Sequence, residues 1–191
     1  MLLPILTRVA ALPLLAHAAA AIATVAGFQL AKGRLDASYT ASKHPVDYMT
    51  GQTSFSGQTI KAYYAEMQDA GTLNVYFTTQ LIDFGFIVAM ACIGLFICTL
   101  IARLGRVDSL GRRVGLFAGL SFLLGAACDA IENGWSFVML ANPADFANWL
   151  ALPYSTFASL KFGLVTLGML LVLVSILSAG TGRLLKKPRI G

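Results

Sequence analysis

The sequence is poor in charged residues. Asp, Glu, Lys and Arg make up 12% of its 191 residues, and hydrophobic residues make up 57%. An ordinary soluble domain carries roughly 25% charged residues, so this composition argues against a soluble globular enzyme. It also excludes a disordered chain, which would be rich in charge and poor in apolar residues. The remaining class is a small polytopic membrane protein, with enough length for about four spans of ~20 residues.

Cysteine and histidine are also scarce, with three and two residues respectively. The three cysteines lie inside apolar runs, so no disulfide framework is expected. Two histidines without clustered cysteines predict no metal site. The chain also lacks phosphate-binding glycine loops and the short hydrolase and metalloprotease motifs. We therefore expect no cofactor and no nucleotide-driven transport, and the basic segments give no indication of nucleic-acid binding.

Four apolar runs predict four membrane-spanning helices in a single domain over residues 1–191. Only helices satisfy their own backbone hydrogen bonds within one lipid-exposed segment. The expected fold is an all-α, integral membrane four-helix bundle, in which glycines allow close helix packing. The predicted spans cover residues about 9–31, 75–102, 114–140 and 150–180. The glycines within the runs are Gly27, Gly85, Gly94, Gly119, Gly125, Gly134, Gly163 and Gly168.

The first connection, residues 33–74, is too long for a simple turn. Within it, apolar side chains at Ile60, Tyr63, Tyr64 and Met67 follow helical spacing. We therefore expect a long ordered outer loop that carries a short amphipathic helix over about 58–70. Its polar stretch over 43–57 suits the mouth of a polar pocket. The remaining connections are a cytoplasmic loop at 103–113 and a basic cytoplasmic tail at 181–191.

Charge asymmetry predicts the orientation. The segments before the first span, between spans two and three, and after span four hold nine of the fourteen basic residues and one acidic residue, Asp108. The positive-inside rule then places both termini in the cytoplasm. An Ala- and Gly-rich chain without glycosylation sequons is compatible with a bacterial inner membrane. The first run, which follows Arg8, also resembles a secretory signal, but its length favours a retained helix.

Four formally charged residues fall inside the predicted spans: Asp83, Asp129, Glu132 and Lys161. Such a residue costs about 2.5–3.5 kcal/mol on insertion scales, so a compensating partner is required. With a rise of ~1.5 Å per residue, the three helices bring these groups to nearly the same outer level. We therefore expect them to meet in one polar cavity, with Lys161 pairing Asp83 or Glu132.

The expected site assigns roles to individual residues. Asp129 and Glu132 are the candidates for proton exchange, because three carboxyl groups facing one ammonium group leave a surplus of negative charge. Lys161 is expected to hold an anionic head group or to tune a neighbouring carboxyl. The further binding candidates are Asp83, Asn133, Gln80 and His44. His17 is expected to lie mid-membrane as a hydrogen-bonded packing residue.

Two functions fit this pattern, and whether the chain is an enzyme stays open. In the first, the site binds or processes a small amphiphile, a lipid or a cation. In the second, the chain is a non-catalytic assembly subunit whose charges pair with helices of a membrane partner or of a second copy. The lipid bilayer is the expected environment in both. Loss of activity at normal yield on Glu132→Gln would favour the first, and stoichiometric co-purification of a partner would favour the second.

Overall fold

The computed structural model describes residues 2–184, and no strand occurs in that range. Four helices are long and apolar enough to cross a membrane: Leu14–Ala41, Leu73–Ala102, Leu110–Leu140 and Asn148–Thr181. The predicted all-α class and the membrane-spanning helices are therefore confirmed, and they indicate an integral membrane protein. The predicted basic tail lies outside the described residues from position 185 onward.

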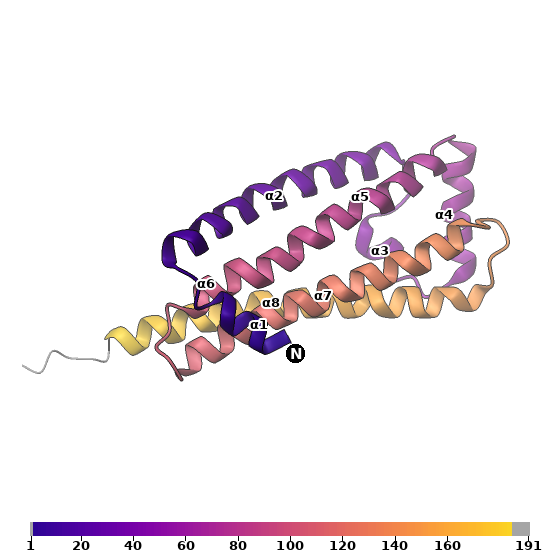
Figure 1. The fold of residues 1–191 in the computed structure, drawn as a ribbon. Coiled ribbons are helices and arrows are strands. Elements are labelled where there is room, and N and C mark those ends of the chain that lie inside the picture. The colour runs from indigo at the N-terminus through magenta and orange to yellow at the C-terminus, as the bar shows by residue number, and fades with distance from the viewer. Residues whose placement is uncertain (1, 185–191) are drawn as a thin grey trace, which may run out of the picture. The chain divides into compact units, whose positions relative to one another are not determined.

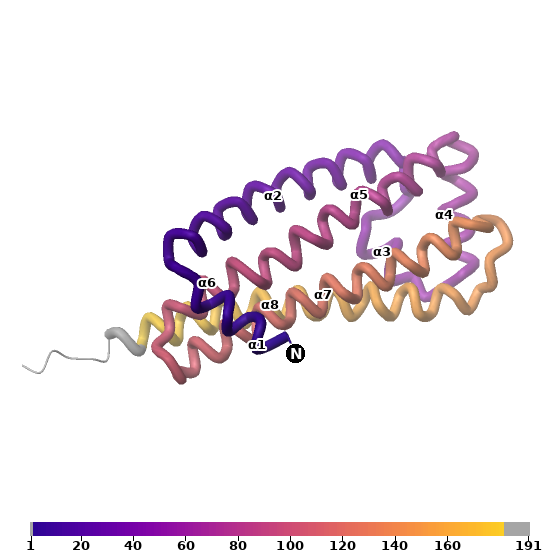
Figure 2. The backbone as a smooth tube through the Cα atoms, viewed as in Figure 1, coloured from indigo at the N-terminus to yellow at the C-terminus, as the bar shows by residue number. Residues whose placement is uncertain are grey.

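The first apolar run does not form one helix over 9–31. It is divided into α1 (Leu2–Val9) and α2 (Leu14–Ala41), and Figure 2 shows the turn that joins them. Pro13 explains the break, because proline has no backbone N–H and disfavours a helical conformation in the preceding residue. The carbonyl of Pro13 then accepts the first α2 bond, from His17 N at 2.9 Å. His17 therefore lies in the first turn of α2 and not half-way along a helix that began near Arg8.

Helix α2 continues well past the predicted end at residue 31. Lys32 and Asp36, one turn apart, form an ion pair on the helix surface. Such a pair supports an exposed helical turn at a position where the chain is no longer apolar. Helix α2 ends at Ala41, and Lys43 has a left-handed φ of 54°. The connection to the next long helix is therefore 42–72 rather than 33–74.

Two short helices lie in this connection, α3 (Tyr48–Gln52) and α4 (Gly57–Asp69). The side chain of Ser56 caps α4 by accepting a bond from Thr59 N at 3.2 Å. At the other end, Gly71 has a φ of +68° and Thr72 N bonds back to Met67 O at 2.8 Å. This bond pattern is a common helix stop that requires a left-handed residue.

Figure 1 labels the elements in chain order. Helix α5 (Leu73–Cys92) continues through a π-helical segment, η1 (Ile93–Cys98), into the short α6 (Thr99–Ala102). Helix α7 (Leu110–Leu140) follows, and a single 3-10 turn, η2 (Asn148–Leu150), leads into α8 (Ala151–Leu184). The π-helical segment was not predicted.

The chain divides into two compact units. Unit 1 comprises Met1–Ala26, Met90–Leu124 and Leu164–Gly191, and unit 2 comprises Gly27–Ala89 and Gly125–Gly163. In unit 1 the helices approach through small residues: a Cβ atom added at Gly94 would lie 2.7 Å from Gly119 O, and the reverse distance to Gly94 O is the same. Ser175 Oγ donates to Gly111 O at 2.7 Å. Small residues thus permit backbone-to-backbone packing in this unit.

Unit 2 has an aromatic core at the 42–72 connection. Tyr64 and Met67 of α4 are buried with Tyr76 of α5 and Tyr154 of α8. Gly57 fits closely against η2, where an added Cβ would lie 2.6 Å from Asn148 Cα, and Lys61 Nζ donates to Asn148 Oδ1 at 3.0 Å. Helix α4 is therefore fixed to the elements beside it rather than exposed as a free loop.

Candidate functional site: a buried lysine and three carboxyl groups

Lys161 lies at the centre of the polar cluster in unit 2. Its ammonium group donates to Glu132 Oε2 at 2.5 Å, to Asp129 Oδ1 at 2.7 Å and to Gln52 Oε1 at 3.0 Å. An ammonium group has three protons and no acceptor. All three protons of Lys161 are therefore used within the chain, by acceptors from α7 and α3.

Helix geometry brings the two α7 carboxyl groups to the same lysine. Asp129 and Glu132 are three residues apart, so their side chains lie on one face of α7. Gln52 reaches the cluster because the connection after α3 is held against α8, where Phe55 N donates to Ser155 Oγ at 3.1 Å. The faces of α7 and α8 in the cluster are predictable from the spacing of residues. Gln52, at the end of the short helix α3, joins them only because of how the connection packs.

Asp83 belongs to the same region but contacts a different partner. Asn133 Nδ2 donates to Asp83 Oδ2 at 2.8 Å, which links α7 to α5. The predicted pair of Lys161 with Asp83 is replaced by pairs with Asp129 and Glu132, whereas the predicted pair with Glu132 is present. Because Asp83 has no cationic partner among residues 2–184, its charge is compensated only by an amide N–H and by more distant groups.

The cluster has a more accessible and a less accessible part. Lys161, Asp83 and Asp129 retain 7%, 6% and 4% exposure, whereas Glu132 and Asn133 are completely buried. Glu132 and Asn133 are therefore the least accessible of these five residues.

Three buried polar atoms around Glu132 have no hydrogen-bond partner among the described residues. They are Glu132 Oε1, Asn133 Oδ1 and the hydroxyl oxygen of Tyr64. Leaving such an atom buried without a partner costs about 1–3 kcal/mol, and more when the group is charged. Asn133 Oδ1, and Glu132 Oε1 when the carboxyl group is ionised, can only accept a hydrogen bond, whereas the Tyr64 hydroxyl can also donate one.

Three tyrosines surround the completely buried glutamate. Tyr64, Tyr76 and Tyr154 are each close enough to Glu132 for its charge to act on their hydroxyl groups. Burial raises the pKa of Tyr64, with a smaller contribution from Glu132 in the same direction. Tyr64 therefore keeps its proton at neutral pH and can donate a hydrogen bond or accept one.

Gln80 and His44 lie beside the acids but make other contacts. Gln80 Nε2 donates to Ser136 Oγ at 2.5 Å and to Tyr76 Oη at 3.2 Å. His44 stacks on Tyr39 and packs against Tyr63 and Tyr76, with ring centroids 5.2 Å apart in each pair. Neither residue makes a hydrogen bond to a carboxyl group among the described residues, so the structure does not bring these two binding candidates into contact with the acids.

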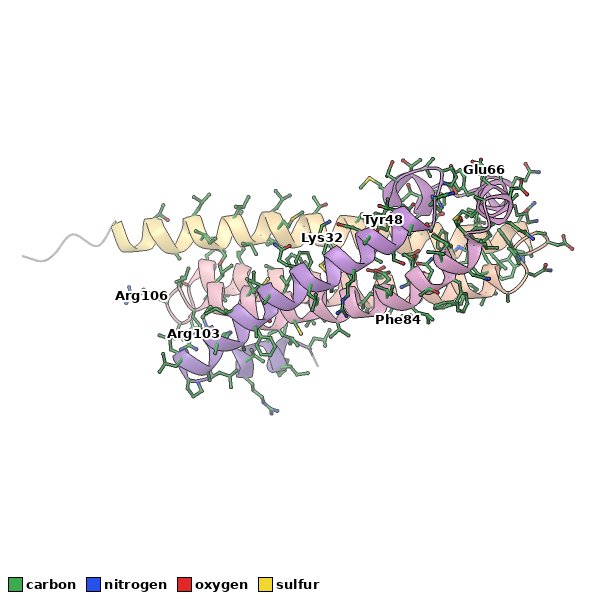
Figure 3. All side chains as sticks on the ribbon, turned by 90° about the horizontal axis from the view of Figure 1, so that it is seen from above. Lys32, Tyr48, Glu66, Phe84, Arg103 and Arg106 are labelled. Atoms are coloured by element: carbon green, nitrogen blue, oxygen red, sulfur yellow. The ribbon has the colours of Figure 1, made fainter. Side chains whose placement is uncertain are left out.

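Tyr48 completes this aromatic group at the edge of the cluster. Its ring centroid lies 3.8 Å from that of Tyr39, and its buried hydroxyl has no hydrogen-bond partner among residues 2–184. Figure 3 labels Tyr48 and shows its position on the short helix that follows α2. Asp36 and Asp83 both act electrostatically on this hydroxyl, and the pKa of Tyr48 is raised chiefly by burial.

His17 belongs to a separate polar contact in unit 1. Its Nε2 atom lies 2.9 Å from Phe96 O and 3.0 Å from Thr99 Oγ1, and Arg103 Nη1 lies 3.2 Å from its Nδ1 atom. Phe96 is in the π-helical segment. Since Arg103 can only donate, Nδ1 accepts and Nε2 carries the proton. This is the hydrogen-bonded packing histidine expected from the sequence.

No group of three or more His, Cys, Asp or Glu side chains in the described part of the chain is arranged to hold a metal ion. In the acid cluster the ammonium group of Lys161 occupies the position between Asp129 and Glu132 where a cation would otherwise bind. The donor set therefore does not favour a resident metal.

The sequence did not reveal the roles of Gln52 and Tyr64. Gln52 lies within the amide- and hydroxyl-rich stretch expected to face a polar pocket, so the composition identified the segment but not the residue. Tyr64 was identified only as part of an apolar helical stripe. A phenol on the buried face of an amphipathic helix, next to buried carboxyl groups, is a pattern that could have identified it.

Comparisons with protein families, with curated proteins and with solved structures find no match to this chain.

Proposed function

We propose that the chain forms a four-helix bundle in the membrane and binds a small amphiphile, whose polar head donates hydrogen bonds to the buried cluster. One observation carries the proposal: Glu132 Oε1 and Asn133 Oδ1, in consecutive residues of α7, are buried acceptors without a donor among residues 2–184. Buried polar groups are almost always hydrogen-bonded. A head group with hydroxyl or amine hydrogens supplies what these two atoms lack.

The same geometry argues against the anionic head group considered from the sequence. Lys161 already donates all three of its protons within the chain, to the carboxylates of Asp129 and Glu132 and to the amide oxygen of Gln52. An anion would have to displace one of these carboxylates and would meet the negative charge of the others. Lys161 therefore acts as the internal counter-ion that keeps Asp129 and Glu132 together, and Glu132 is the group that exchanges a proton.

The proposal also accounts for the charges better than an assembly subunit does. A charge that pairs with a partner's helix would face outward without a partner in the isolated chain. Here Lys161, Asp129 and Glu132 pair with one another, and Asp83 bonds to Asn133. The ionisable groups of the cluster are consequently directed to a common place inside unit 2.

We place the bundle in a bacterial inner membrane with both termini in the cytoplasm. The distribution of basic residues supports this orientation, because Arg103, Arg106, Arg112 and Arg113 lie at one end of the spans. The acid cluster then opens toward the periplasmic side. Labelling of a cysteine introduced at exposed Asp69 by a membrane-impermeant reagent on intact cells would test this placement.

Native mass spectrometry tests the binding proposal. The wild-type protein is extracted in mild detergent, and molecules that remain bound after detergent removal are weighed. We expect a bound amphiphile on the wild type and its loss in Glu132→Gln, since the amide replaces one acceptor by a donor. Glu66→Gln is the matched control, because Glu66 is an exposed glutamate on α4 (Figure 3).

Circular dichroism of each variant checks that the helices are intact. An identical set of bound molecules on the wild type and on well-folded Glu132→Gln would contradict the proposal. Co-purification of a second membrane protein in fixed stoichiometry, lost in Glu132→Gln, would instead support the assembly function.

A further inference from the structure

The charge balance of the cluster narrows the chemical class of the ligand's head group further than hydrogen bonding does. This step rests on the proposed binding function. Asp83, Asp129 and Glu132 face a single cation, Lys161, so full ionisation would leave a surplus of two negative charges in a nearly dry place. An uncompensated buried charge is costly enough that the group usually takes up a proton instead. The empty site therefore holds at least one proton on its carboxyl groups.

Glu132 is a better candidate to hold that proton than Asp83, because Glu132 is completely buried, whereas Asp83 keeps 6% exposure and accepts a hydrogen bond from Asn133. Its Oε2 atom is bound by Lys161, but its Oε1 atom has no partner among residues 2–184 and is completely buried. The titratable groups that face Glu132 come from several elements. They are Asp129 of α7, Asp83 and Tyr76 of α5, Lys161 and Tyr154 of α8, and Tyr64 of α4. Only one of these groups is a cation, and it is shared with Asp129.

A ligand that carries its own positive charge can take the place of the proton. A metal ion is not favoured, since the described residues offer no metal-binding group and Lys161 occupies the space between two of the acids. A protonated amine fits both requirements. It supplies one positive charge, and its N–H hydrogens can reach acceptors such as Glu132 Oε1 and Asn133 Oδ1.

We infer that the site binds an amphiphile with a protonated amine head and releases one proton from Glu132 when it does so. The exchange conserves charge: the ligand brings one positive charge, and the carboxyl O–H of Glu132 breaks to leave its proton in the surrounding water. The carboxylate then accepts a hydrogen bond from the amine. Tyr76, which is close enough to Glu132 for the two groups to interact, offers an aromatic ring that suits contact with a cationic head, and Tyr39 and His44 pack against it.

Four probes with the same twelve-carbon chain separate charge from hydrogen bonding. Dodecylammonium has charge and donors, dodecyltrimethylammonium has charge alone, dodecanol has a donor alone, and dodecyl sulfate is an anion. Each is titrated calorimetrically into nanodiscs holding the wild type, Glu132→Gln or Glu66→Gln. Protein-free nanodiscs of the same lipid supply the background for partition into lipid. Two buffers with different heats of ionisation report the protons released.

In the wild type and in Glu66→Gln, we expect dodecylammonium to bind most tightly of the four probes and to release about one proton. Its affinity should fall about tenfold for each unit by which the pH is lowered. Binding above background should vanish in Glu132→Gln. Equal affinity for dodecanol, or binding without proton release, would overturn the inference while leaving the binding function intact. Preferential binding of dodecyl sulfate, or no probe binding above background, would also overturn it; the mass spectrometry experiment then decides the binding function separately.

Discussion

The two units of the chain bury different kinds of side chain. In unit 1 the buried polar residues of the described range are His17, Thr24, Thr99, Ser121 and Ser175, and none carries a formal charge. Unit 2 buries Asp83, Asp129, Glu132 and Lys161 together with several amides and hydroxyls. The buried polar residues of unit 1 are uncharged, whereas unit 2 contains a charged interior that packing alone does not require.

Several glycines of the spanning helices show a similar contrast, although Gly57 in the 42–72 connection of unit 2 packs closely against η2. In unit 1, Gly94, Gly119 and Gly168 are buried, and an added Cβ would meet neighbouring atoms within 3.0 Å. In unit 2, Gly27, Gly85, Gly134 and Gly163 are exposed, with nothing within 4 Å of an added Cβ. The prediction that all these glycines serve close helix packing is therefore wrong for the second group. Hydrogen bonds and aromatic contacts take that role in unit 2.

The largest expected effect concerns the counter-ion of unit 2. Lys161→Met leaves Gln52, Asp129 and Glu132 without the ammonium group, and removal of one partner from a buried ion pair costs about 3–5 kcal/mol. We expect a large loss in the free energy of unfolding, measured by thermal or denaturant unfolding in detergent. Adding Asp129→Asn and Glu132→Gln to this variant should recover part of the loss. Unchanged stability of the single variant would show that the charges do not hold unit 2 together.

The glycine contrast predicts the next largest effect. Gly94→Ala places a Cβ near Gly119 O and Phe122, so the overpacked contact should cost about 1–3 kcal/mol. Gly85→Ala on the same continuous helix adds its methyl group in open space and should be neutral or stabilising by up to about 1 kcal/mol. Thermal unfolding of both variants measures the difference. Equal effects would remove the distinction between the two units.

Glu132→Gln tests whether the buried acid of unit 2 serves stability or binding. The amide oxygen can still accept from Lys161, and a neutral amide takes the place of the protonated carboxyl group that we infer for the protein without ligand. We therefore expect unchanged or higher stability, by about 0.5–2 kcal/mol, together with the loss of ligand described above. Unfolding curves of Glu132→Gln and Glu66→Gln measure the effect. A severe loss of stability would indicate that Glu132 is a structural ion-pair partner only.

The smallest effect is expected from His44. Burial lowers the pKa of His44 below its usual 6.5, so the folded protein binds this proton less readily than the unfolded chain does. The contribution of the neutral ring to stability is complete above about pH 6.5 and decreases as the pH falls toward the folded-state value. His44→Gln should lack this component when unfolding is followed against pH. The same pH dependence in both proteins would assign it to other groups.

Much of the fold could be predicted, because membrane insertion leaves few choices. Long apolar runs in lipid form helices, so the four spanning helices follow from composition. The break at Pro13 was missed because the uncharged run was interpreted as one helix, although Pro13 directly precedes the start of α2. The extension of α2 to Ala41 was missed because Lys32 and Asp36 were taken as an end, whereas a helix can continue into water with its charges exposed.

The candidate site was predictable at the level of residue type and depth. Charged residues within spans must be compensated, and helical spacing placed Asp129, Glu132 and Lys161 at similar heights. Which acid pairs with the lysine depends on the rotation of α5, α7 and α8 about their axes. The contribution of Gln52 depends on how the 42–72 connection packs against α8. Neither is encoded in the spacing of residues along one helix.

The order of residues alone was enough to specify an all-helical membrane protein with a small set of ionisable groups in its spans, since hydrocarbon excludes unpaired backbone and unpaired charge. The partners of those groups came from the packing of separate segments. The ammonium group of Lys161 has three protons, and the folded chain supplies one acceptor for each of them. Glu132 Oε1 and Asn133 Oδ1 were consequently left without donors, and this is a property of side-chain positions in space that no linear pattern contains.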